Sequence, residues 1–212
     1  MVDARDGHLT LIQPPQGGLF PDWSPRGNLI LLSTVDGGLH AFDGGRHPAD
    51  TVHTIEADGS DLTTLTSRIG ECGEWSPDAT KILFCSHEGD GDFETWVMNA
   101  DGSGARQLTS SPRRNQGALW SPDGRRIVFS SERDGDNELW VMNADGSNEH
   151  RLLRWPDTGE AADAWLPQGI VFASFVPDAP VPSWFIVEPD GTHLRSLPQL
   201  KGVPDPIDWI QP

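Results

Sequence analysis

Two acidic stretches of the sequence contain residue types that bind a hard metal ion. The segments EGDGDFE (88–94) and DGDNE (134–138) place carboxylates at alternate positions beside glycines. Carboxylates on a turn can chelate Ca²⁺, which takes about six to eight oxygen ligands. Neither segment matches the EF-hand loop, so hairpin turns with local hydrogen bonds are the preferred interpretation. Calcium is kept as an alternative, and its candidate ligands are Asp90, Asp92, Asp134 and Asp136.

The histidines and serines show no spacing that is typical of an active site. None of the seven histidines forms an HxH or HxxxH pair of the kind that holds a metal ion. The GxSxG motif, which exposes the nucleophile of an α/β-hydrolase, does not occur in the sequence. We therefore assign no catalytic residue and expect a non-enzymatic protein. A metal-dependent lyase or hydrolase is the alternative.

Five other residues are candidates for contact with a protein partner. Arg113 and Arg114 form a basic pair in an acidic chain, although an ion pair with an adjacent loop is the preferred interpretation. His40 and His47 share one inserted segment, where solvent-exposed loop histidines are expected. Trp155 lies outside the repeating tryptophan positions, and exposed tryptophans are common interface hot spots. Packing between neighbouring sheets is the preferred interpretation for Trp155.

The two cysteines are too few for a disulfide framework or a cysteine zinc site. If the SPDA turn (76–79) closes a tight hairpin, Trp75 pairs with Ile82, and Cys72 then falls opposite Cys85. A disulfide is conceivable in that register, and two buried thiols are the preferred interpretation.

The charge balance narrows the range of partners. Acidic residues outnumber lysine plus arginine by 32 to 15, which gives a net charge of −17. Such a chain repels phosphate backbones and anionic lipid, so we expect no nucleic acid partner. No apolar run approaches the roughly 18 residues of a membrane span, so we expect no membrane insertion. The first residues, MVDARDGHLT, lack signal-peptide features, which predicts a cytosolic protein or a leader outside this chain.

A repeat of about 45 residues organises the sequence. A tryptophan recurs at intervals of 52, 45, 45 and 44 residues, at Trp23, Trp75, Trp120, Trp165 and Trp209. An Asp-Gly pair follows each of the first four, and the longer first interval indicates an insertion of about ten residues within 34–50.

Each unit contains four short apolar runs that are separated by turn sequences. Around Trp120 these runs are ALW, RIVFSS, ELWVMNA and HRLL, with the β-branched and aromatic residues typical of strands. The SPDG and ADGS segments between them provide Pro- and Gly-containing turns. Four antiparallel strands repeated in this way predict the blades of a β-propeller. The predicted blades span residues 21–66, 73–109, 118–153 and 163–198.

The sequence WSPDG, followed by RDGDNELWVMNADGS and a closing RLL, resembles the TolB-like β-propeller repeat. The resemblance is strongest over 75–109 and 120–153 and weakest over 165–197, where WLPQG replaces WSPDG. It implies an interaction scaffold in the bacterial periplasm or outside the cell. The same repeat occurs in the propellers of tricorn-type and prolyl-oligopeptidase-type peptidases. A peptidase gating propeller without its catalytic domain is therefore a further alternative.

The two chain ends are complementary parts of one more unit. Residues 1–12 align with the end of a unit and residues 204–212 with its opening strand. Propellers commonly close by sharing one blade between the termini, which removes exposed sheet edges. The predicted fold is therefore an all-β propeller with four complete blades and a partial blade shared by the N- and C-termini. Part of a larger ring, or a homo-oligomer whose chains complete each other, remains open.

The irregular loops are expected on one face of this fold. Connections between second and third strands, and between successive units, lie on the face opposite the SPDG and ADGS turns. Variable loops on a constant scaffold commonly carry binding. The sequence therefore predicts that this loop-rich face presents the protein to a protein partner.

Overall fold

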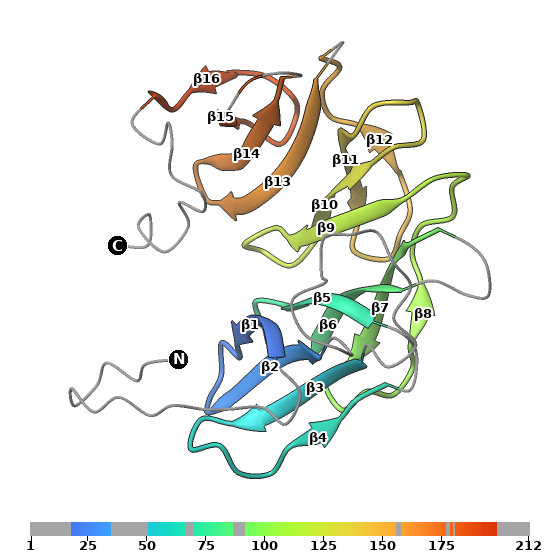
Figure 1. Ribbon diagram of the computed structural model, residues 1–212, viewed down its shortest axis with the longest axis vertical. Coiled ribbons are helices and arrows are strands. Elements are labelled where there is room, and N and C mark those ends of the chain that lie inside the picture. Colours follow the sequence, from blue (N-terminus) through green and yellow to red (C-terminus); the bar gives the residue numbers. More distant parts are fainter. Residues whose placement is uncertain are drawn as a thin grey trace. The chain divides into compact units, whose positions relative to one another are not determined.

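The computed structural model is built from β-strands in the part of the chain that it describes. The described residues are 18–34, 51–66, 70–86, 92–155, 158–176, 179 and 181–198. They form four antiparallel sheets of four strands each, and within each sheet consecutive strands are neighbours (Figure 1). The predicted all-β fold of four-stranded blades is therefore confirmed. The partial blade predicted for 1–12 and 204–212 lies outside the described residues.

Contacts within the chain divide it into two units, residues 1–90 with 96–106 and residues 91–95 with 107–212. The first two sheets contain β1 (Gly18–Trp23), β2 (Leu29–Thr34), β3 (Thr51–Glu56), β4 (Thr63–Thr64), β5 (Gly70–Trp75), β6 (Lys81–Ser86), β7 (Glu94–Asn99) and β8 (Arg106–Gln107). The last two sheets contain β9 (Asn115–Trp120), β10 (Arg126–Ser131), β11 (Glu138–Asn143), β12 (His150–Arg151), β13 (Gly159–Leu166), β14 (Gly169–Phe175), β15 (Ser183–Val187) and β16 (Arg195–Ser196). Across the described residues, no helix is long and apolar enough to cross a membrane.

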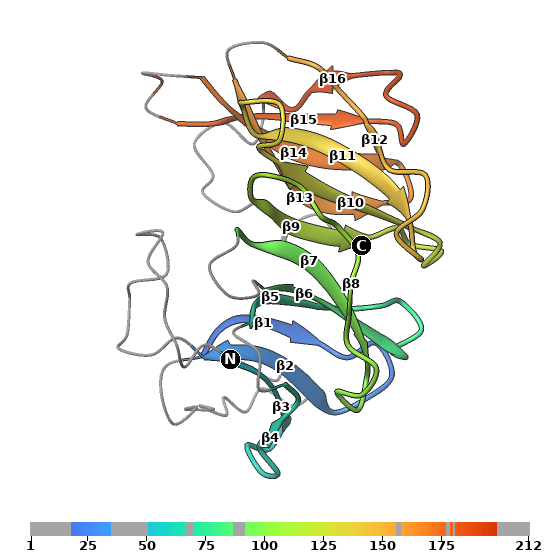
Figure 2. The same ribbon diagram turned by 90° about the vertical axis from the view of Figure 1, so that its right-hand side faces the viewer.

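In the second unit, the apolar core lies between the β9–β12 sheet and the β13–β16 sheet. Val128 and Leu139 of the former share one cluster with Trp165 and Phe172 of the latter. Figure 2 shows the strands of both sheets from the right-hand side of Figure 1, where the two sheets overlap in the view. The consecutive residues Ile127, Val128 and Phe129 of β10 are all fully buried. Because adjacent strand residues point to opposite faces, both faces of this sheet are covered, as in a propeller blade.

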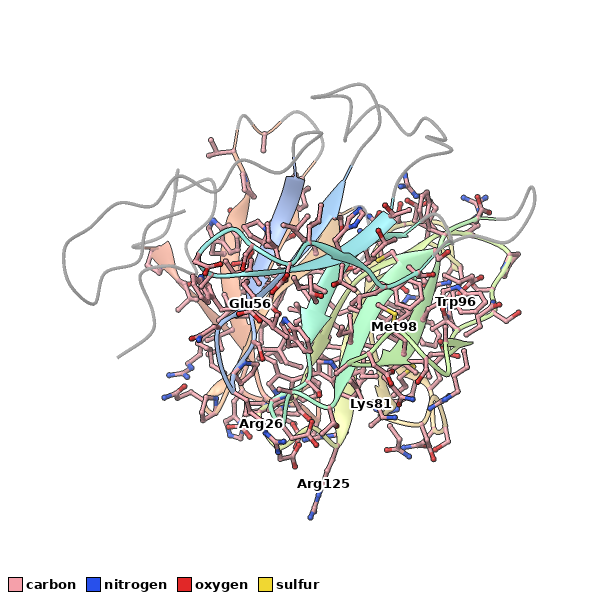
Figure 3. All side chains as sticks on the ribbon, turned by 90° about the horizontal axis from the view of Figure 1, so that it is seen from below. Arg26, Glu56, Lys81, Trp96, Met98 and Arg125 are labelled. Carbon is pink, nitrogen blue, oxygen red and sulfur yellow. The ribbon has the colours of Figure 1, made fainter. Side chains whose placement is uncertain are left out.

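The first unit repeats this packing between its own sheets. Leu31 of β2 shares a buried cluster with Trp75 of β5 and Phe84 of β6. Trp96 and Met98, two residues apart on β7, belong to the same cluster, as Figure 3 indicates. The opening tryptophan of the second module thus packs against the sheet that precedes it.

A β-bulge in the opening strand of every sheet changes the register that the sequence predicts. Trp75 pairs with Ile82 as expected, but the register then shifts, and Glu71 pairs with Cys85. Cys72 therefore lies in the bulge rather than opposite Cys85, and the predicted facing of the two cysteines is wrong. The extra residue of a bulge has no partner of its own and displaces all later pairs by one. Cys85 is a buried thiol, as the preferred interpretation predicted.

The Asp-Gly turn between the third and fourth strands is a second point of contact between neighbouring sheets. Gly102 has φ +82°, and a Cβ at this position would lie 2.3 Å from the carbonyl oxygen of Leu65. Gly191 repeats the arrangement, with a hypothetical Cβ 2.7 Å from the carbonyl oxygen of Leu152. The glycine therefore provides both the left-handed backbone and the space for the preceding sheet.

We expect Gly102→Ala to lower the free energy of unfolding by about 2–4 kcal/mol, through left-handed strain and a clash with Leu65. Gly59 is the matched control, because its φ is +87° and no described atom lies within 4 Å of its hypothetical Cβ. Gly59→Ala should cost only about 1–2 kcal/mol. Urea denaturation of both variants measures the difference. Equal losses of unfolding free energy in the two variants would contradict the role of close packing between sheets at Gly102, or would show that another segment packs against Gly59.

Candidate interaction surface on the third and fourth sheets

The second unit contains a polar pocket at the end where β10 turns into β11, which is called the loop end below. The pocket has a volume of about 390 Å³, and it is lined by Asp134, Asp136, Glu138, Arg151 and Arg154. The hairpin between β10 and β11 supplies the two aspartates, β11 begins with the glutamate, and β12 ends with Arg151. One of the two acidic stretches identified in the sequence therefore forms a wall of this pocket.

Arg151 neutralises part of this acidic wall. Its Nη1 donates hydrogen bonds to Glu138 Oε2 at 2.8 Å and to Asp134 Oδ2 at 3.0 Å. The bond to Glu138 raises the pKa of Arg151, so the guanidinium stays charged. Glu138 is 6% exposed, and this cation offsets the cost of burying its carboxylate.

These contacts do not bring the four predicted calcium ligands together. Asp134 bonds to Arg151, Asp92 is exposed, and Asp90 lies outside the described residues. Within the described part of the chain, no group of three or more His, Cys, Asp or Glu side chains is arranged to hold a metal ion. Calcium binding at these positions stays a prediction.

Glu94 is the counterpart of Glu138 in the preceding module, and it is satisfied by neutral donors. Its Oε2 accepts hydrogen bonds from Thr109 Oγ1 and from Asn115 Nδ2, the latter at 2.7 Å. Its Oε1 accepts a hydrogen bond from the backbone N–H of Ser111 at 2.8 Å. Asn115 is fully buried, and its Oδ1 accepts a hydrogen bond from Arg133 Nη2 at 3.0 Å. The network joins the start of β7 to the start of β9.

Glu160, near the start of β13, is a fully buried carboxyl group that the sequence did not single out. Its Oε1 accepts a hydrogen bond from Thr158 Oγ1, whereas Oε2 has no hydrogen-bond partner. Burial, with a smaller contribution from the negative charges of Glu138 and Asp136, raises the pKa of Glu160 to about 7. The repeat pattern does not reveal this glutamate, because the corresponding position in the preceding module carries a different residue type.

The β14–β15 hairpin adds an exposed apolar group at the same end of the fourth sheet. Phe175 and Val176 are each 50% exposed, and Val181 is 38% exposed. Phe175 ends β14, and Val176 and Val181 lie in the connection between β14 and β15. Their position agrees with the sequence-based expectation that irregular loops gather on one face.

The structure places the other predicted partner residues as follows. Trp155 is half-buried, and its ring packs edge-on against Phe185 with centroids 4.7 Å apart. Arg114 is half-buried, with its guanidinium 5.3 Å from the ring centroid of Phe93, whereas Arg113 is exposed. Their partner-binding role stays a prediction, and the same prediction for His40 and His47 lies outside the described residues.

Comparison with known proteins defines the family. The family model of the TolB β-propeller domain matches residues 10–179. This match covers most of the chain, and the protein belongs to the TolB β-propeller family.

Two curated relatives and one solved structure illustrate the range of similarity. The Tol-Pal system protein TolB of Anaeromyxobacter dehalogenans is 41% identical over 102 residues, which cover 48% of this chain and 21% of that protein. An uncharacterized protein of Agrobacterium fabrum is 29% identical over 156 residues, covering 57% of this chain and 53% of that protein. The structure of a putative TolB from Agrobacterium tumefaciens superposes with a TM-score of 0.66 at 24% identity, covering 87% of this chain and 81% of that one. This chain thus spans from about a fifth to about half of the curated relatives.

We expect Glu94→Ala to lower the free energy of unfolding by about 2–4 kcal/mol, because it leaves buried donors on Thr109 and Asn115 without their acceptor. Asp92→Ala, two residues away and exposed, should change it by less than about 0.5 kcal/mol. Guanidinium denaturation distinguishes the two variants. A Glu94 variant as stable as Asp92→Ala would contradict a structural role for this network.

Proposed function

We propose that this protein is an interaction module whose binding surface is the end of the third and fourth sheets formed by the β10–β11 and β14–β15 hairpins. The observation that carries the proposal is the exposed apolar group of Phe175, Val176 and Val181. Protein interfaces combine an apolar centre with a polar rim. On this surface the apolar hairpin supplies the centre, and the acidic hairpin with Asp134 and Asp136 supplies the rim.

The charge of the surface favours a partner with basic side chains around an apolar contact. Asp134 is half exposed and Asp136 is exposed, and the whole chain carries a net charge of −17. Complementary charge accelerates association and excludes partners of like charge. A basic protein therefore fits this surface better than an acidic one.

The relative in Anaeromyxobacter dehalogenans is named as a Tol-Pal system protein, which supports a role alongside other proteins. By the same resemblance, we propose a periplasmic or extracellular location. The homo-oligomer that the sequence left open, in which chains complete each other's ring, is a separate proposal and does not use this surface.

The proposal predicts that loss of the apolar hairpin removes binding while the fold is kept. Immobilised wild-type protein and a Phe175→Ser/Val176→Ser variant are incubated with extract of the cells that express the protein, and retained proteins are quantified. The variant should retain at least tenfold less of a specific protein, because apolar anchors carry most interface energy.

Leu194→Ser is the matched control, because Leu194 is 42% exposed in the β15–β16 connection, away from this surface. The control should bind like the wild type. Equal retention by all three proteins, or equal loss in both variants, would overturn the proposed surface. Measurement of mass in solution tests the homo-oligomer separately.

A further inference from the structure

Glu160 occupies the position that Asn115 occupies in the preceding module. In the third sheet, Asn115 of β9 pairs with Ser131 of β10. In the fourth sheet, Glu160 of β13 pairs with Ser174 of β14. Each opening strand has one bulge after this pair, so the two positions are equivalent in register.

The facing positions are equivalent as well. Glu94 begins β7 and Glu138 begins β11, and both strands run for six residues to an asparagine. At the earlier junction, Asn115 Nδ2 donates a hydrogen bond to Glu94 Oε2. At the later junction, a carboxyl group takes the place of that amide, so the equivalent positions carry two acidic residues, Glu138 and Glu160.

Glu138 and Glu160 differ in what neutralises them. Arg151 donates a hydrogen bond to Glu138, and the two side chains form an ion pair. Glu160 accepts only from the Thr158 hydroxyl, and its Oε2 is buried without a partner. The charged groups that line the neighbouring pocket are Asp134, Asp136, Glu138, Arg151 and Arg154, and Asp163 lies on β13 itself. Arg133, in the β10–β11 connection, bonds to Asn115 and Glu149 instead. A fully buried carboxylate in such surroundings has lost its hydration without gaining a cation.

We propose that Glu160 carries a proton in the folded protein at mildly acidic pH, and that this proton replaces the amide donor of Asn115 at the junction between the β9–β12 and β13–β16 sheets. The junction then holds at acidic pH and loses stability as the proton leaves near neutral pH. The burial and the neighbouring charges that raise the pKa of Glu160 to about 7 agree with this assignment.

The sign of the pH dependence follows from the direction of this shift. The pKa of Glu160 in the folded protein lies above the ordinary value of 4.5 that applies to the unfolded chain. The stabilising contribution is therefore complete below about pH 4.5, and it is lost as the pH rises through about 7. A shift of this size corresponds to roughly a hundredfold increase in the unfolding equilibrium constant between pH 5 and pH 8.

The test compares urea denaturation of the wild type, Glu160→Gln and Asp92→Asn between pH 5 and pH 8. Glu160→Gln keeps the shape of the side chain and supplies a permanent amide donor. We expect it to remove most of the hundredfold change and to be more stable than the wild type at pH 8. Asp92→Asn removes an exposed carboxylate of the same unit and should keep the wild-type profile. Asp22 is half-buried, burial raises its pKa to about 6, and it contributes equally to all three proteins.

A direct titration separates the proton from a purely structural role. The ¹³C chemical shift of Glu160 Cδ, assigned by its loss in Glu160→Gln, should titrate with a midpoint near 7 in the folded protein. In Glu138→Gln the midpoint should fall, because one of the charges that oppose ionisation is gone. A midpoint below about 5.5, or a Glu160→Gln profile with the same pH dependence as the wild type, would overturn the proposal.

Discussion

Burial of both faces of each sheet is the constraint from which the other features of this fold follow. Four short strands cannot bury an apolar face by themselves, so each sheet depends on the sheet beside it. Ile127, Val128 and Phe129 succeed one another in one strand without solvent contact. The opening tryptophan and the turn glycine are two parts of the same contact, since Trp165 enters the shared core while Gly191 admits the backbone of Leu152.

Close apolar packing then determines which polar groups are cut off from water at the loop end. Once the sheets are in contact, Glu94 at the start of β7 lies against Asn115 of the next opening strand, and Glu138 begins β11 at the equivalent position. The protein satisfies this position with neutral donors around Glu94 and with a guanidinium beside Glu138. The same backbone thus supports two different polar junctions, because the apolar core and not the polar pair determines the spacing between sheets.

The sequence predicts the repeated parts of this structure well and the local departures poorly. The tryptophan interval, the SPDG and ADGS turns and the four apolar runs predict strands and sheets, since each follows from a short-range rule. The bulges have no such signal, and the resulting register shift is why Cys72 does not face Cys85. Glu160 was missed because its burial arises from a neighbouring sheet, and a single side chain in a strand does not show what covers it. The exposed Phe175 and Val176 were anticipated only as part of an irregular loop.

The connections between strands differ in how much length they tolerate. In the first three sheets, the segments that join the first two strands have equal lengths: 24–28, 76–80 and 121–125. The segments that join the second and third strands differ in length: 35–50, 87–93 and 132–137. The former end holds the glycine contacts that space the sheets. The connections at the latter end differ in length from sheet to sheet, although their described residues also bond to neighbouring strands, as the carbonyl oxygen of Asn137 does by accepting from the N–H of Glu160. One residue added to segment 121–125 would therefore shift a sheet against its neighbour. The fold separates an edge with connections of one length from an edge whose connections vary in length.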